Sequence, residues 1–215
     1  MARDRWATFD CYGTLIDWNG GIRRELARVF GDGEADERLD RYHELEPVLQ
    51  VGGARSYREV MTEAMRGLGA PGGEASGLAE SLPSWEPFPE VRPALEDARA
   101  RGWKLAILSN TDRDLIDASL KRIGVPFELA IVASEIGSYK PEHTHWASFF
   151  EETGASRERH VHVAQSYFHD IAPANELALR SIWINRYGER HTPPPTRELS
   201  DLSNLPQALD DLVAA

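Results

Sequence analysis

The strongest constraint on the fold is a series of five short apolar runs, each of a length typical of a β-strand. They occupy residues 6–9, 105–108, 129–132, 161–164 and 181–184. Near-continuous apolar runs of this length suit strands that are buried on both faces. From about residue 90 onward the runs alternate with stretches of helical periodicity. This alternation predicts an α/β fold, with a parallel sheet that carries helices on both faces.

The helical stretches carry the end signals expected of helices, with proline near the start and glycine after the end. Pro93 lies just inside one predicted start, and Gly102 follows the end of the same helix. A second helix is expected to end before Gly124. Pro141 is predicted to open a third helix, which ends before Gly154.

Residues 17–89 break the alternation, because they show helical patterns and no convincing strand. The simplest interpretation is a helical insertion after the first strand, which we call the cap segment. It is expected to lie above the carboxyl end of that strand, where α/β sheets bind ligands. The predicted division is therefore a core of residues 1–16 and 90–215 and a cap segment of residues 17–89.

Charge and composition narrow the class of partner. The chain has 24 Lys and Arg against 35 Asp and Glu, a formal net charge of −11. Such an acidic chain is a poor match to the phosphate backbone of nucleic acids. No stretch approaches the roughly 20 apolar residues that span a bilayer, and the first ten residues contain no run typical of a signal peptide. The only cysteine, Cys11, excludes an intramolecular disulfide, so we expect a cytoplasmic protein with no nucleic-acid or membrane partner.

Four polar clusters come directly after predicted strands. They occupy residues 10–14, 109–112, 138–141 and 169–170. Because the carboxyl ends of parallel strands meet at one edge of a sheet, these clusters are expected to converge.

These clusters resemble, in order and spacing, the four signatures of the haloacid dehalogenase superfamily. The resemblance runs from about residue 5 to 187. It implies a Rossmann-like core with a cap inserted after the first strand, and a hydrolase whose carboxylate nucleophile is Asp10. The matching motifs are Phe9-Asp10-Cys11-Tyr12-Gly13-Thr14-Leu15, Leu108-Ser109-Asn110, Tyr139-Lys140-Pro141 and His169-Asp170-Ile171.

The residue types suit that chemistry. A carboxylate becomes a useful nucleophile when it is fixed, desolvated and supported by donors. Lys140 is expected to hold the two carboxylates of Asp10 and Asp170 together and to keep Asp10 ionised at neutral pH. Thr14 is expected to donate a hydrogen bond to Asp10 or to the substrate. Ser109 and Asn110 are expected to bind the substrate, although both also suit the cap of a following helix.

The residue two positions after the nucleophile bears on the reaction. Magnesium-dependent phosphatases of this superfamily usually carry a second Asp there, as a general acid and base; this chain has Tyr12. The Asp-x-Tyr-Gly-Thr form resembles the L-2-haloacid dehalogenase branch. That branch implies that Asp10 displaces halide from carbon, that water activated by Asp170 hydrolyses the ester, and that no metal or other cofactor takes part.

The same branch implies three further substrate-binding residues. Arg41 matches the cap arginine that accepts the halide, although an exposed helix arginine fits the pattern too. Trp146 matches an aromatic residue six positions after the lysine, or a core residue, and Tyr12 is the third. In the fourth motif, Gln165 and Tyr167 replace the small polar residues that position the hydrolytic water in such enzymes.

Two other functions stay open at this stage. One is hydrolysis of another small carboxylate by the same nucleophile, for example a strained cyclic amino acid. The other is a Mg²⁺-dependent small-molecule phosphatase, in which Asp10 and Asp170 would be metal ligands. His160 and His162 share a strand face and are interpreted as core residues. The expected partner is a small carboxylate substrate, and related enzymes suggest a homodimer.

Overall fold

The computed structural model describes residues 4–52 and 55–215 and has an α/β fold, as predicted. Within these residues one six-stranded sheet runs in the order β3-β2-β1-β4-β5-β6, and every neighbouring pair is parallel. The sequence predicted five of these strands, to within two residues at each end. The strands are β1 (Arg5–Phe9), β2 (Trp103–Ser109), β3 (Leu129–Val132), β4 (His160–Ala164), β5 (Arg180–Ile184) and β6 (Arg197–Leu199).

Strand β6 was not predicted, because its three residues contain two exposed charged side chains and no apolar run. It lies at the edge of the sheet, where it pairs only with β5. An edge strand has one partner and need not be apolar on both faces. Its pairing is therefore a property of the assembled sheet.

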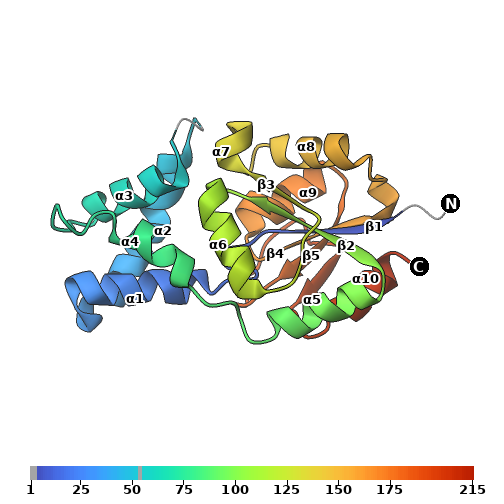
Figure 1. Ribbon diagram of the computed structural model, residues 1–215, viewed down its shortest axis with the longest axis horizontal. Coiled ribbons are helices and arrows are strands. Elements are labelled where there is room, and N and C mark those ends of the chain that lie inside the picture. Colours follow the sequence, from blue (N-terminus) through green and yellow to red (C-terminus); the bar gives the residue numbers. More distant parts are fainter. Residues whose placement is uncertain (1–3, 53–54) are drawn as a thin grey trace.

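Helices cover both faces of the sheet (Figure 1). Side chains alternate along β2, so that Leu105 and Ile107 pack in one apolar cluster while Ala106 and Leu108 pack in another. The first cluster includes residues of α5 (Val91–Ala100), α6 (Arg113–Ile123) and α10 (Leu205–Leu212). The second includes residues of α8 (Thr144–Thr153) and α9 (Ala172–Glu176). A short helix, α7 (Ala133–Ile136), follows β3.

In its described residues the cap segment contains four α-helices, which lie together beside the sheet at the left of Figure 1. They are α1 (Trp18–Phe30), α2 (Ala35–Gln50), α3 (Tyr57–Gly67) and α4 (Gly77–Ser81). The chain enters and leaves them through two paired segments, because Asp17 N donates to Glu86 O and Phe88 N donates to Leu15 O. The exact boundaries at residues 17 and 89 stay a prediction.

Of the five predicted helix-end signals, four are correct and one is wrong. Pro93 lies in the first turn of α5, and Gly102 follows that helix. Gly124 and Gly154 follow α6 and α8 in the left-handed conformation, with φ of 68° and 61°. Pro141 does not open a helix, since α8 begins at Thr144. The side chain of Asn110 accepts a hydrogen bond from Lys140 N at 2.6 Å and donates one to Lys140 O at 2.9 Å. These bonds hold the backbone of Lys140 in a turn, and the helix starts after it.

No helix in the described ranges has the length and hydropathy needed to cross a membrane.

Candidate active site

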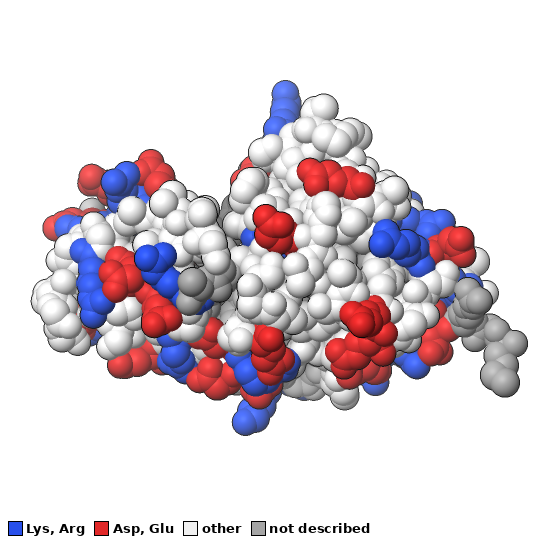
Figure 2. Space-filling model, turned by 90° about the horizontal axis from the view of Figure 1, so that it is seen from above, with Lys and Arg blue, Asp and Glu red and all other residues white. Residues whose placement is uncertain are grey.

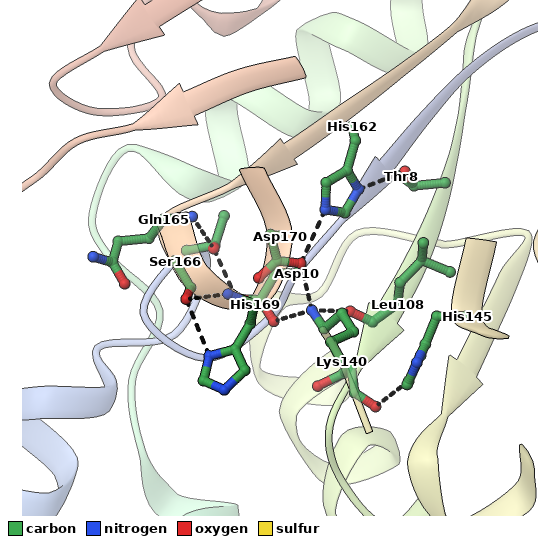
Figure 3. A network of polar contacts seen from close by, with 12 residues as sticks. Thr8, Asp10, Leu108, Lys140, His145, His162, Gln165, Ser166, His169 and Asp170 are labelled. Carbon is green, nitrogen blue, oxygen red and sulfur yellow. Dashed lines mark hydrogen bonds and ion pairs between the residues drawn. The ribbon is translucent and has the colours of Figure 1, made fainter. Parts of the chain in front are cut away.

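A buried lysine joins two carboxylates at the carboxyl edge of the sheet (Figure 3). Lys140 Nζ lies 3.0 Å from Asp10 Oδ1 and 2.6 Å from Asp170 Oδ1, and it donates a third hydrogen bond to Leu108 O at 2.9 Å. Asp10 follows β1, Leu108 belongs to β2, and Asp170 follows β4. Three strands that are separate in sequence thus position one ammonium group, as the motif spacing predicted.

The electrostatics of this cluster differ between its members. Burial raises the pKa of Asp10, and the nearby Lys140 ammonium offsets only part of that rise. Burial also raises the pKa of Asp170, but Lys140 and a hydrogen bond from His162 outweigh it and lower the pKa to about 2. The two carboxylates raise the pKa of Lys140 despite its burial. Near neutral pH Asp170 is therefore an anion and Lys140 a cation, while at Asp10 burial favours the neutral form and Lys140 favours the anion.

Thr14 supports the second oxygen of Asp10. Its hydroxyl donates to Asp10 Oδ2 at 2.8 Å and accepts a hydrogen bond from Gln165 N at 2.9 Å. The turn between them passes through Gly13, whose φ of +90° is unfavourable for other residues. Both oxygens of Asp10 consequently have donors, and the carboxylate is held in one orientation.

Ser109 and Asn110 lie in the site but differ in what they offer a substrate. Asn110 is engaged by the backbone of Lys140 and also donates to Gln50 Oε1 of α2 at 3.1 Å. The buried hydroxyl of Ser109 has no partner among the described residues. Ser109 also lines the pocket. Its hydroxyl is therefore free to donate to a ligand oxygen.

The cluster lies in a pocket of about 420 Å³ between the core and the cap segment. The core contributes Asp10, Ser109 and Lys140, and the cap segment contributes Trp18, His43 and Glu46. Trp18 stacks on the His43 ring, with 5.2 Å between ring centroids. A pocket of this size suits a small molecule.

Three predicted substrate-binding residues lie elsewhere or face differently. Arg41 is not among the residues that line this pocket; its side chain is 60% exposed and pairs with Glu44 on the outer side of α2. Trp146 is buried among apolar residues, with its ring 5.2 Å from that of His162. Tyr12 lines the pocket with its ring, while its hydroxyl bonds to Ser119 Oγ on α6.

Residues on the inner face of α2 were missed by the sequence interpretation. His43, Glu46, Pro47 and Gln50 line the pocket, and their spacing of three and four residues is that of one helix face. Arg41 lies outside this face, which is why it points to solvent. Burial raises the pKa of Glu46 to about 7. The helical period was the available signal, but which face turns inward depends on packing.

The fourth motif forms a π-helical turn, Tyr167–Ile171, instead of a simple helix start. Tyr167 donates its hydroxyl to Pro193 O at 2.6 Å and stacks on His191 at 4.4 Å. Its hydroxyl is thus bonded to the backbone at Pro193. Asp170 Oδ2 is buried and has no hydrogen-bond partner among the described residues. That oxygen is the free acceptor of the site.

The donor set offers little to a metal ion. In the described part of the chain no group of three or more His, Cys, Asp and Glu residues could hold one. Lys140 already bridges the two carboxylates through one oxygen of each. Lys140 therefore already supplies positive charge between the two carboxylates, and only the second oxygen of each lies outside its hydrogen bonds.

The chain is similar to haloacid dehalogenases in sequence and in fold. The family model of haloacid dehalogenase-like hydrolases matches residues 5–177. Haloacetate dehalogenase H-2 of Moraxella sp. (strain B) is 32% identical over 84% of this chain and 85% of that protein. (S)-2-haloacid dehalogenase H-109 of Pseudomonas putida is 27% identical over 94% of this chain and 96% of that protein. The crystal structure of an L-2-haloacid dehalogenase has the same fold, with a TM-score of 0.84, 21% identity and coverage of 97% of this chain and 100% of that chain.

Proposed function

The chain belongs to the haloacid dehalogenase-like hydrolases, and from that premise we propose that it displaces halide from a small 2-haloacid through an ester on Asp10. The observation that carries this proposal is the buried pair of carboxylates bridged by Lys140, with Thr14 on the second oxygen of Asp10. It presents an ionised, oriented carboxylate at the floor of a pocket suited to a small molecule.

In the first step an oxygen of Asp10 forms a bond to the α-carbon, the carbon–halogen bond breaks, and the halide leaves with its electron pair. Ser109 Oγ is the free donor for the substrate carboxylate. A halide needs no proton to leave, which fits Tyr12, whose hydroxyl is held by Ser119 away from the reacting carbon. No acid is therefore required at position 12.

In the second step water attacks the carbonyl carbon of the Asp10 ester and gives a proton to Asp170 Oδ2. The carbonyl–oxygen bond to the former substrate then breaks, and the departing alkoxide takes that proton to become a 2-hydroxy acid. Asp10 is again a carboxylate, and one net proton, corresponding to the halide released, enters the solvent. We propose that neither step uses a metal ion, because Lys140 balances the charge of the two carboxylates.

The test is halide release from chloroacetate and 2-chloropropionate in excess chelator. The wild-type protein is expected to release halide under these conditions. Asp10→Asn is expected to lose at least about a thousandfold in kcat/KM while keeping its circular dichroism spectrum. Phosphate release from p-nitrophenyl phosphate that appears only with Mg²⁺, without halide release, would instead support the phosphatase.

A second candidate follows from the charge of the pocket. Among the described residues that line it, Lys140 is the only Lys or Arg, whereas the cap segment contributes the carboxyl of Glu46. A carboxyl group there favours a leaving amine over a leaving halide. For a strained cyclic amino acid, Asp10 would bond to the α-carbon as the carbon–nitrogen bond breaks and Glu46 protonates the nitrogen. Its pKa of about 7 leaves Glu46 partly protonated at neutral pH.

One substitution separates the two candidates. Glu46→Gln keeps the shape of the side chain but removes its proton transfer and its charge. Halide release that survives this change supports dehalogenation. Opening of azetidine-2-carboxylate by the wild-type protein, lost in Glu46→Gln, supports the cyclic amino acid. The product of ring opening can be followed by its primary amine.

A further inference from the structure

Behind the reacting carboxylates a line of buried polar side chains runs into the core of the sheet (Figure 3). His160 Nε2 lies 2.8 Å from Thr8 Oγ1, and the same oxygen lies 2.8 Å from His162 Nδ1. His162 Nε2 in turn lies 3.0 Å from Asp170 Oδ1. Thr8, His160 and His162 are fully buried and lie on β1 and β4. Polar groups so deep in a core are costly unless they are paired.

We infer that His162 is a positioning residue for ester hydrolysis: it holds Asp170 by Oδ1 and leaves Oδ2 to the hydrolytic water. The inference rests on the proposed two-step function and concerns its second step only. The inference also assigns roles to His160 and His162, which the sequence analysis interpreted as core residues.

The hydrogen bonds determine the tautomer of His162. Burial lowers the pKa of His160 well below its ordinary value, so this ring carries one proton. Its Nδ1 has no partner among the described residues, and a buried N–H without an acceptor costs more than a bare nitrogen. The proton is therefore on Nε2 of His160, which donates to Thr8 Oγ1.

Donation from His160 to Thr8 bears on the next hydrogen bond, between Thr8 and His162. Having accepted from His160, Thr8 has its own hydroxyl proton to donate to His162 Nδ1. Asp170 is ionised and can only accept, so His162 carries a proton on Nε2 and donates it to Asp170 Oδ1. The result is a fixed N–H aimed at the carboxylate. The ring of His162 is also held by the edge of Trp146, at 5.2 Å between centroids.

Two donors therefore share one oxygen of Asp170. Lys140 Nζ at 2.6 Å and His162 Nε2 at 3.0 Å both bond to Oδ1, while Oδ2 has no partner among the described residues. Lys140 is shared between Asp170 and Asp10, and the charge of Asp10 is lost when Asp10 becomes an ester. His162 has no bond to Asp10, so its hold on Asp170 persists through the second step. This is the step that needs Oδ2 in place.

The test measures ester formation and ester breakdown separately, by rapid quench and mass spectrometry with 2-chloropropionate. His162→Leu removes the donor and is expected to slow breakdown about 10- to 100-fold with little change in formation, so that the ester accumulates on Asp10. His162→Gln, which keeps an N–H donor on a side chain of comparable reach, is expected to restore much of the breakdown rate. Thr8→Val removes the hydroxyl at nearly constant volume and is expected to give an intermediate rate.

The matched control is His160→Leu, because it removes the same volume from the same strand face without touching Asp170. Breakdown is expected to change less than about threefold, since Thr8 still donates to His162. Equal slowing of both steps in His162→Leu, or ester accumulation in His160→Leu alone, would overturn the inference. Should His162→Leu fail to fold, an unchanged breakdown rate in Thr8→Val would also overturn it. A wild-type protein that forms no ester on Asp10 would instead refute the proposed function.

Discussion

At the scale of single residues, Lys140 controls the charge state of the nucleophile. Under the proposed function Asp10 attacks only when ionised; its pKa is raised by burial and held down by the Lys140 ammonium. Activity should therefore rise with pH as Asp10 loses its proton, at a pH above the ordinary range of an aspartate. On the alkaline side the raised pKa of Lys140 keeps the ammonium charged.

Replacing Lys140 by Met should move the acid limb of the kcat/KM profile to higher pH. Without the ammonium, burial and the charge of Asp170 still raise the pKa of Asp10, and only the hydrogen bond from Thr14 lowers it. The residual activity should also fall by at least about a hundredfold, because the two buried carboxylates then lose the cation between them. Thr14→Val is the graded control, since it removes one hydrogen bond and should shift the limb less. An acid limb unchanged in Lys140→Met would contradict this role.

For Arg41, in contrast to Lys140, we predict that substitution has little effect on activity. The family resemblance implies that it accepts halide, but its side chain faces solvent beside Glu44 and lies outside the pocket. Arg41→Ala should therefore change halide release less than about twofold, as expected for an exposed ion pair. Steady-state kinetics with 2-chloropropionate checks this. A large loss would show that α2 turns during the reaction.

At the scale of secondary-structure elements, Asp112 connects the core to the cap segment. It precedes α6, yet its carboxylate accepts hydrogen bonds from Tyr57 N at 2.9 Å and Arg58 N at 3.0 Å, in the first turn of α3. A carboxylate at a helix start satisfies otherwise free N–H groups and interacts well with the helix dipole. The carboxylate of one element thus completes the end of another.

Asp112→Ala should lower the free energy of unfolding by about 2 kcal/mol, because two buried N–H groups lose their acceptor. Urea denaturation followed by tryptophan fluorescence measures this change. Asp114→Ala is the matched control: Asp114 pairs with Arg58 from an exposed position, so its loss should leave the unfolding midpoint nearly unchanged. Equal effects of the two substitutions would show that Asp112 does not stabilise the contact between the core and the cap segment.

At the scale of the whole molecule, basic and acidic side chains are interspersed over the face shown in Figure 2, and the basic ones do not gather in one patch there. The pocket itself is acidic apart from Lys140. Under the proposed function the substrate is an anion that the overall charge of −11 repels, so we expect local hydrogen-bond donors such as Ser109 to bind it. Added salt should lower KM for chloroacetate modestly by screening this repulsion.

The expected homodimer stays a prediction at this scale. Sedimentation equilibrium should give twice the chain mass of 24.1 kDa if it is correct. A mass that remains that of a single chain at micromolar concentration would refute it.

The sequence alone determined the fold class, the family and the members of the polar cluster at the carboxyl edge of the sheet. Five strands could be predicted because burial on both faces requires an uninterrupted apolar run, which local sequence displays. Asp10, Ser109 and Asp170 could be placed together because they lie at or just after the ends of parallel strands, which meet at one edge, and Lys140 because its motif follows β3 and α7. The family model and the relatives confirm the resemblance that these motifs indicated.

Tertiary structure alone decided which side chains complete the site. The inward face of α2 includes Glu46 and Gln50 rather than Arg41, because packing on the core sets the rotation of a helix whose polar and apolar residues are not segregated onto separate faces. Trp146 packs against His162, and His162 bonds to Asp170. These pairings join β4 to residues outside it, so no local pattern encodes them. They depend on distances that exist only once the sheet is assembled.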